Sequence, residues 1–114
     1  MTDCLFCKIV AGEIPANILH STDDAIAFRD IDPKAPTHVL VVPREHIATV
    51  NDLQPAHESL VGKLFTIARQ VAHEDGLADA GYRLVMNCGK GAGQSVFHIH
   101  LHLLGGRSLD WPPG

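Results

Sequence analysis

The most regular hydrophobic pattern lies in the middle of the chain and predicts one long helix. Apolar residues recur there at steps of four, three and four positions: Leu60, Leu64, Ile67 and Val71. This spacing puts them on one face of an α-helix. Since proline suits a first helical turn and glycine commonly ends helices, we expect the helix to begin near Pro55 and to end near Gly76, with Asp52 as a candidate N-terminal cap.

A shorter apolar stretch near the N-terminus predicts a second helix. Residues 4–11 read CLFCKIVA, and Gly12 follows them as a helix stop. The segment Ile14-Pro15-Ala16 then turns the chain. This helix is therefore expected to be brief and to stand apart from the long one.

Five short apolar runs, bounded by turn residues, predict strands. They cover residues 18–21, 24–29, 38–43, 82–87 and 96–104. The first two form a hairpin across Thr22-Asp23, and Pro33 and Pro36 keep the loop of residues 30–37 out of any ladder.

The order of these elements favours an α+β fold. The strands are joined mostly through turns and the helices are segregated, which is typical of an antiparallel sheet. We therefore predict an antiparallel sheet of about five strands with one long and one short helix, in a single domain of residues 1–114. The tail after residue 104, which ends in WPPG, should be irregular.

Composition and charge narrow the class of protein. The chain has 114 residues, of which 46% are hydrophobic and 19% charged, as in soluble globular proteins. With a net charge of −4, the chain lacks the excess of basic residues expected of a protein that binds nucleic acid. No apolar stretch approaches membrane-spanning length and the first residues lack a secretory signal, so we expect no membrane partner and a cytoplasmic location.

Three histidines alternate with apolar residues in FHIHLHLL, residues 97–104. Because successive side chains of a strand point to opposite faces, His98, His100 and His102 should share one face while the residues between them pack on the core. Positions two apart lie about 6–7 Å from each other along a strand. That spacing is too long for the rings to hydrogen-bond one another and suits contacts around one small anion.

Three interpretations of this row differ in their chemistry. The simplest is that the three histidines merely lie on a solvent-exposed face of the sheet, but random placement seldom gives strict alternation. A catalytic metal held by all three rings is disfavoured, because tetrahedral ligands converge from several directions whereas these lie in a line. A histidine nucleophile is favoured, because neutral imidazole attacks phosphorus near neutral pH and can form a covalent intermediate.

A glycine-rich segment precedes the histidines. Residues 87–95 read NCGKGAGQS, and Gly89, Gly91 and Gly93 would let backbone amides approach an anion closely. The segment lies between strands and not before a helix, so it is no dinucleotide-binding fingerprint. Beside three histidines it favours a phosphate site.

The C-x-x-C motif of the first predicted helix indicates metal chemistry. Cys4 and Cys7 sit one helical turn apart, so both thiols can reach one ion. A tetrahedral structural zinc needs two further ligands, for which His46 and His98 are candidates. A redox dithiol or a pair of buried thiols are the alternatives.

Four blocks of the sequence, in order, resemble the histidine triad (HIT) family. They are FCKIVAGEIP, DIDPKAPTHVLVVP, GQSVFHIHLHLLGGR and the terminal WPPG. They cover nearly the whole chain and are most similar to the HINT branch of purine nucleoside phosphoramidases. This resemblance implies a hydrolase that releases a nucleoside monophosphate and an amine from adenosine phosphoramidate-like substrates, through a nucleotidyl-histidine intermediate. A dinucleoside polyphosphate hydrolase and a nucleotide-binding regulatory or scaffold protein are the alternatives.

The resemblance also implies roles for individual residues. The nucleophile would be His100, with His102 on the phosphate, His38 as the supporting histidine of the relay and Ser95 near the leaving group. Substrate-binding positions would be Asp30 on the ribose hydroxyls, Phe28 and Ile31 on the purine, and Asn87 and Gly93 on the phosphate side.

Two further properties follow from the same resemblance. Zinc is expected as a structural cofactor on Cys4, Cys7, His46 and His98, as in related members that carry the C-x-x-C motif. Two protomers are expected to join their sheets in a homodimer, with Trp111 of the tail near the partner's active site.

Overall fold

The computed structural model describes residues 3–114, and within them it has two α-helices and five strands. In chain order the elements are α1 (Leu5–Val10), β1 (Ile18–Ser21), β2 (Ala25–Arg29), β3 (Thr37–Pro43), α2 (Glu58–Glu74), β4 (Tyr82–Val85) and β5 (Leu101–Gly105). Short 3₁₀ turns lie at Val50–Asp52, Pro55–His57 and Lys90–Ala92.

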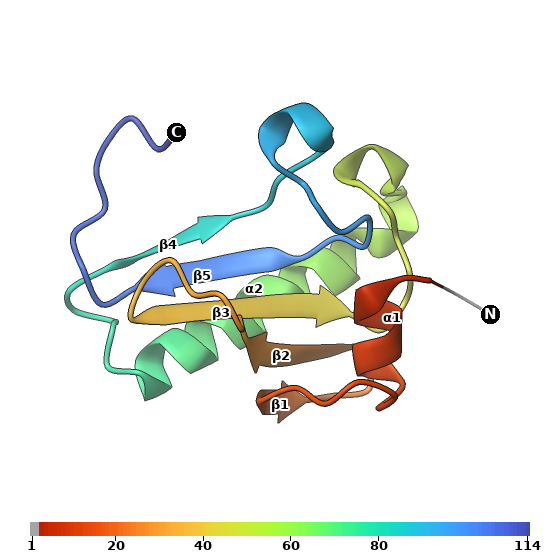
Figure 1. Cartoon of the computed structure of the whole chain (residues 1–114), viewed down its shortest axis with the longest axis horizontal. Helices are drawn as coiled ribbons and strands as arrows, with labels where there is room; N and C mark the ends of the chain where they lie inside the picture. The colour runs from red at the N-terminus through yellow and green to blue at the C-terminus, as the bar shows by residue number, and fades with distance from the viewer. Residues whose placement is uncertain (1–2) are drawn as a thin grey trace.

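The strands form one antiparallel sheet in the order β1-β2-β3-β5-β4, and both helices lie against it (Figure 1). This confirms the predicted α+β fold with one long and one short helix. The central pair matters most for function, because it brings two histidine-bearing strands together. In its register Leu40 lies opposite His102 and His38 lies opposite Leu104, so the two histidines are diagonal neighbours.

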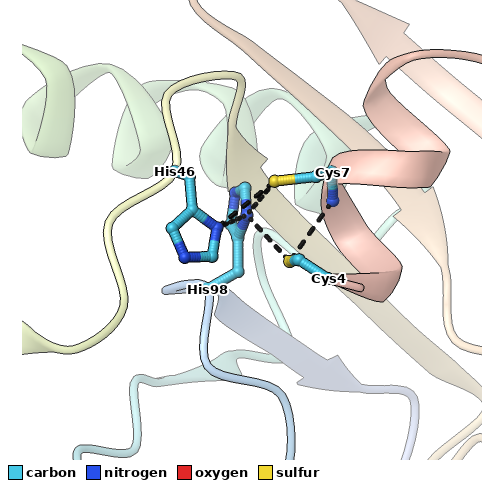
Figure 2. A group of neighbouring side chains, drawn as sticks. All are labelled: Cys4, Cys7, His46 and His98. Carbon is cyan, nitrogen blue, oxygen red and sulfur yellow. Dashed lines mark hydrogen bonds between the residues drawn. The ribbon is translucent and has the colours of Figure 1, made fainter. Parts of the chain in front are cut away.

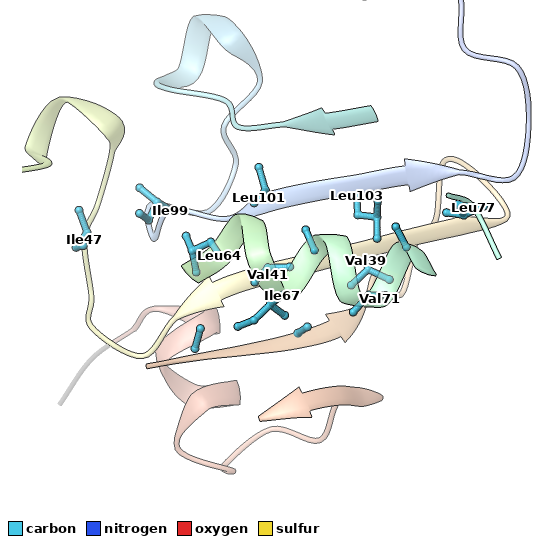
Figure 3. Packing of buried hydrophobic residues seen from close by; sticks show 14 residues of the cluster. Val39, Val41, Ile47, Leu64, Ile67, Val71, Leu77, Ile99, Leu101 and Leu103 are labelled. Carbon is cyan, nitrogen blue, oxygen red and sulfur yellow. The ribbon is translucent and has the colours of Figure 1, made fainter. Parts of the chain in front are cut away.

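The central strand β3 has a core on each side, because its side chains alternate between the two faces of the sheet. Val39 and Val41 face α2, whereas Leu40 and Val42 face the side of α1. All seven residues of β3 are buried, as expected of a strand covered on both faces. The α2 residues of the first core include Leu64, Ile67 and Val71, three of the four positions predicted from periodicity (Figure 3).

The predicted cap of the long helix is wrong. The carboxylate of Asp52 accepts hydrogen bonds from the backbone N–H and the hydroxyl of Thr49, both at 3.0 Å, and so closes a separate 3₁₀ turn. The turn Pro55–His57 then leads into α2, which begins at Glu58.

The histidine-bearing strand is shorter than predicted, because its first residues bond to a loop in place of a ladder. β5 begins only at Leu101. The backbone N–H of Ile99 donates to the carbonyl of Ile47, at 2.8 Å, in the loop that follows β3. Alternation nevertheless continues through this segment, since Ile99, Leu101 and Leu103 are all buried in the α2 core.

Within residues 3–114, neither helix is both long and apolar enough to cross a membrane.

Candidate active site and metal centre

A cavity of about 230 Å³ opens between α1 and the histidine-bearing face of the sheet. Six of the residues predicted for the active site line it: Phe28, Asp30, Ile31, Ser95, His100 and His102. Segments that are far apart in the sequence therefore meet here, since β2, the loop after it and the approach to β5 each supply a wall. Ile31 is 97% exposed at this cavity, so its apolar surface is open to a ligand.

His100 is held with one nitrogen turned to the backbone and the other available. Its Nδ1 lies 2.8 Å from the carbonyl oxygen of His98, so Nδ1 carries the proton and donates it. In the neutral ring Nε2 then keeps a lone pair. The ring is almost fully buried, and burial lowers its pKa below the ordinary value, which favours this neutral form.

His102 has the opposite proton placement, because of a chain of hydrogen bonds that starts at the backbone. The N–H of Lys34 donates to His38 Nδ1 at 3.0 Å, so the proton of neutral His38 sits on Nε2. That Nε2 lies 2.9 Å from His102 Nδ1, which must accept, and the proton of His102 is therefore on its own Nε2. Burial, together with the neighbouring His100 and His38, lowers the pKa of His102 to about 4, and burial also lowers the pKa of His38.

The spacing expected for the histidine rings is corrected by the structure. The rings of His100 and His102 lean together, with centroids 4.8 Å apart, closer than their positions along an extended strand suggest. His100 precedes the first residue of β5, so the regular strand spacing does not hold there. His102 Nδ1 still accepts its hydrogen bond from His38 and not from His100.

Asp30 lies at the end of β2, beside the relay. Its Oδ2 is 3.5 Å from His38 Nε2, and its Oδ1 accepts a hydrogen bond from the N–H of Asp32 at 2.8 Å. The carboxylate is thus fixed at the cavity wall.

The glycine-rich loop is organised from within, by a residue that sequence reasoning missed. The buried amide of Gln94 accepts from the N–H of Gly89 at 2.8 Å and donates to the carbonyl of Ala48 at 2.8 Å. The N–H of Gly93 donates to the carbonyl of Lys90 at 3.0 Å. Two of the three glycine amides expected to face an anion are therefore already bonded within the protein.

Two predicted phosphate-side residues lie outside the walls of this cavity. Gly93 ends the 3₁₀ turn of the loop with φ of 92°, a conformation that favours glycine. Asn87 lines a different cavity, between β4 and the C-terminal tail, together with Trp111. The structure therefore does not place these two residues at the walls of this cavity.

The four predicted metal ligands meet in one cluster (Figure 2). Cys7 lies in α1 and Cys4 is the N-cap of that helix, while His46 comes from the loop after β3 and His98 from the approach to β5. Their donor atoms all lie within 4.8 Å of one another. His46 Nδ1 is 3.2 Å from His98 Nδ1 and 3.2 Å from Cys7 Sγ, and His98 Nδ1 is 3.4 Å from Cys4 Sγ and 3.5 Å from Cys7 Sγ.

These distances fit a tetrahedral zinc ion. Bond lengths of about 2.3 Å to sulfur and 2.0–2.1 Å to nitrogen give tetrahedron edges of about 3.3 Å between nitrogens and about 3.5 Å between nitrogen and sulfur. The second requirement is an unprotonated nitrogen aimed at the ion. His98 meets it, because its Nε2–H donates to the carbonyl of Pro43 at 2.7 Å and leaves the Nδ1 lone pair toward the cluster.

Little in the sequence pattern indicated that α1 also lines the active-site cavity. Leu5, Phe6 and Ile9 line the cavity, and the Phe6 ring stands edge-on to His100 with centroids 4.9 Å apart. The signal available was the block FCKIVAGEIP, but its residues could be assigned to a wall only once the side of the sheet covered by α1 was known.

The comparisons with known proteins agree with this geometry. The HIT domain family model matches residues 11–109, and the chain therefore belongs to the HIT family. The purine nucleoside phosphoramidase of Escherichia coli strain K12 is 49% identical over 107 residues, which are 94% of this chain and 90% of that protein.

Solved structures resemble the whole chain. A HIT family hydrolase from Legionella pneumophila Philadelphia 1 superposes with a TM-score of 0.96 at 52% identity, covering 98% of this chain and 100% of that one. A histidine triad nucleotide-binding protein from Candida albicans gives a TM-score of 0.83 at 30% identity, over 96% of this chain and 83% of that one.

Proposed function

We propose that this protein hydrolyses purine nucleoside 5′-phosphoramidates, with adenosine phosphoramidate as a representative substrate. Membership of the HIT family and the similarity to a phosphoramidase support a hydrolase of this class. The observation that carries the proposal is the opposite proton placement of two histidines in one cavity. His100 offers a lone pair and His102 offers an N–H, which are the two groups that displacement at a phosphorus atom needs.

In the first step Nε2 of His100 attacks the α-phosphorus. A P–N bond forms to the ring as the P–N bond to the leaving amine breaks. His102 donates its Nε2–H to a phosphoryl oxygen and stabilises the developing charge. The Ser95 hydroxyl gives the departing nitrogen its proton and is reprotonated from solvent. The positive charge that His100 acquires strengthens the hydrogen bond from its Nδ1–H to the His98 carbonyl.

In the second step water attacks the same phosphorus. The bond between phosphorus and Nε2 of His100 breaks, the water proton passes to solvent, and the nucleoside monophosphate leaves. The ring returns to its neutral form, with the Nδ1 proton still held by the His98 carbonyl. Two displacements of moderate difficulty thus replace one difficult displacement.

The rest of the cavity suits a purine nucleoside. Phe28 and the exposed Ile31 offer apolar area for stacking a planar base. Asp30, which lines the cavity, would accept hydrogen bonds from the two ribose hydroxyls. Asn87 and Gly93, which do not line this cavity, are assigned to the phosphate side.

Turnover of adenosine phosphoramidate tests the proposal. The wild-type protein should release AMP, and His100→Gly should lower kcat by more than about 10³-fold because no nucleophile remains. Parallel assays with a dinucleoside polyphosphate separate the hydrolase alternatives. A His100→Gly protein that keeps most of its rate would refute the nucleophile, and tight AMP binding without turnover would favour a regulatory nucleotide-binding role.

We further propose that the cluster of Cys4, Cys7, His46 and His98 holds a structural zinc ion. Four protein ligands close the coordination sphere and leave no position for substrate, which supports a structural role. Bound zinc would tie α1 to the loop after β3 and to the approach to β5.

A homodimer and a cytoplasmic location complete the proposal. β4 is an edge strand of the sheet, and Trp111 is 81% exposed at the cavity beside it, so this side of the molecule is suited to a second copy. Sedimentation equilibrium would test the dimer. The reduced thiols that a zinc cluster needs are compatible with the cytoplasm.

A further inference from the structure

The metal centre and the active-site cavity share α1. This helix carries Cys7 on the side of the cluster, follows directly on Cys4, and contributes Leu5, Phe6 and Ile9 to the cavity. At six residues it is too short to be stable by itself, so its place depends on what it packs against and what its ends bind. A cation on the two thiols would therefore also hold one wall of the cavity.

Phe6 lies between the two cysteines and contacts both sites. Its side chain is 4% exposed. Its ring centroid is 4.9 Å from that of His100 at an interplanar angle of 84°, and 6.0 Å from that of His98 at 76°. Edge-to-face contacts of this kind restrict the rotation of the rings that they join.

A second connection runs through the backbone of His98. Its Nδ1 points into the cluster, its Nε2–H is bound to the carbonyl of Pro43, and its own carbonyl accepts the Nδ1–H of His100. The residue whose ring would bind the cation thus also holds the proton of the nucleophile. A shift of His98 would move that acceptor and release the His100 ring.

We propose that the metal centre positions the nucleophile, and that Phe6 is the positioning residue that couples the bound cation to His100. The proposal rests on the function proposed above, in which His100 attacks phosphorus. With the cation bound, α1 and the segment from His98 to His100 are fixed together. Without it, α1 loosens, the cavity wall formed by Leu5, Phe6 and Ile9 retreats, and His100 loses its fixed orientation.

His46→Asn tests the metal side of this coupling. His46 is exposed, so its replacement removes a ligand without opening the core, and His73→Asn at an exposed position of α2 is the matched control. We expect the His46 variant to purify without zinc and to bind AMP about tenfold more weakly by calorimetry. The amides of Lys8 and Ala11, which bond within α1, should exchange hydrogen at least about tenfold faster. His73→Asn should match wild type. Zinc-free protein with wild-type exchange and AMP affinity would overturn the proposal.

Phe6→Leu tests the coupling residue in zinc-loaded protein. The variant should keep one equivalent of zinc and lose roughly 10- to 100-fold in kcat, because a small misplacement of the nucleophile costs this much. The imidazole ¹⁵N shifts of His100, which differ between the two tautomers by far more than the loss of a ring current can cause, should move toward those of a tautomer mixture. A residue that only filled space would lower stability and leave those signals and kcat unchanged, and that result would overturn the assignment.

These readouts keep the inference separate from the proposed reaction. If the wild-type protein does not cleave adenosine phosphoramidate, the proposed function fails. Amide exchange of α1 and the His100 ring signals, compared with and without zinc, still decide whether the metal centre fixes the nucleophile.

Discussion

A neutral histidine ring carries its proton on one of two nitrogens, and around this cavity the backbone decides which. The carbonyl of His98 selects Nδ1 of His100, and the N–H of Lys34 selects Nε2 of His38, which in turn selects Nε2 of His102. His100 thereby offers a lone pair and His102 an N–H, although both are histidines and lie only two positions apart.

Replacing His38 by phenylalanine tests this relay. The substitution keeps a ring but removes the donor to His102 Nδ1, so His102 no longer has a fixed tautomer. We expect kcat for adenosine phosphoramidate to fall about 10- to 100-fold. His20→Phe is the matched control, since His20 bonds to Glu74 and is not part of the cavity wall. Equal rates for the two variants would contradict the relay.

The low pKa of His102 predicts that acid destabilises the fold. Its pKa is about 4 in the folded protein against 6.5 unfolded, so between these values the unfolded chain binds the extra proton. Its contribution to the free energy of unfolding is complete above pH 6.5 and is lost as the pH falls toward 4. The full shift corresponds to about 3 kcal/mol, and partial exposure reduces it to about 1–2 kcal/mol.

Urea unfolding between pH 7.5 and pH 4.5 measures this contribution. Wild type should lose more stability over that range than His102→Gln, by about 1–2 kcal/mol, while zinc release affects both proteins alike. Identical slopes in the two proteins would show that His102 does not carry the effect.

At the residue scale the sequence predicted the face of the sheet on which each side chain lies, but not where each histidine carries its proton. Strand alternation correctly put the three histidines on one side and Ile99, Leu101 and Leu103 in the core. Proton placement depends on which group each ring meets, and for His102 that group is the ring of His38, 64 positions away in the chain. No local pattern encodes that distance.

At the scale of elements, an ion pair at the C-terminal end of α2 fastens the helix to the sheet. The carboxylate of Asp75 accepts hydrogen bonds from both terminal nitrogens of Arg29, at 2.9 and 3.0 Å, and from the hydroxyl of Thr37, at 2.9 Å. The arginine holds the pKa of Asp75 below its ordinary value, and Asp75 raises the pKa of Arg29. Arg29 also lines the active-site cavity, so this contact links the helix to the wall that carries Asp30.

Asp75→Asn should lower the free energy of unfolding by about 1–3 kcal/mol, because it leaves a half-buried guanidinium without its charged partner. Asp24→Asn is the control for a surface pair, since Asp24 meets Lys63 in solvent, and it should cost less than about 1 kcal/mol. Denaturant unfolding of both variants checks the difference. Equal losses would mean that the α2 contact is no stronger than a surface ion pair.

Elements with a strong local pattern were predicted well, and those shaped by distant contacts were not. The periodicity of α2 and the β-branched run of β3 gave both elements close to their observed bounds. The start of β5 was wrong, because Ile99 bonds to a loop that the sequence does not place beside it. The cap at Asp52 was wrong because a nearer partner, Thr49, competes for the carboxylate.

At the scale of the whole molecule, the metal centre joins segments that the sheet alone does not hold together. Cys4 and His98 are separated by 94 positions and meet within 3.4 Å. Sequence spacing suggested this ligand set, but only the packing of α1 on the face opposite α2 explains why the metal centre forms next to the nucleophile. The same packing makes zinc binding a contribution to folding, because the unfolded chain cannot present the four ligands together.

Zinc removal should therefore lower the thermal stability of the whole protein. Elemental analysis of protein purified without added metal should give close to one equivalent, and a strong chelator should lower Tm by several degrees, since binding to the native state adds a free energy that grows with the ratio of zinc to Kd. Cys4→Ala combined with Cys7→Ala should abolish both the zinc and the chelator effect, while Cys88→Ala, outside the cluster, should retain them. Less than about half an equivalent of zinc in wild type, or a chelator effect that persists without the two thiols, would rule out this centre as the source of stability.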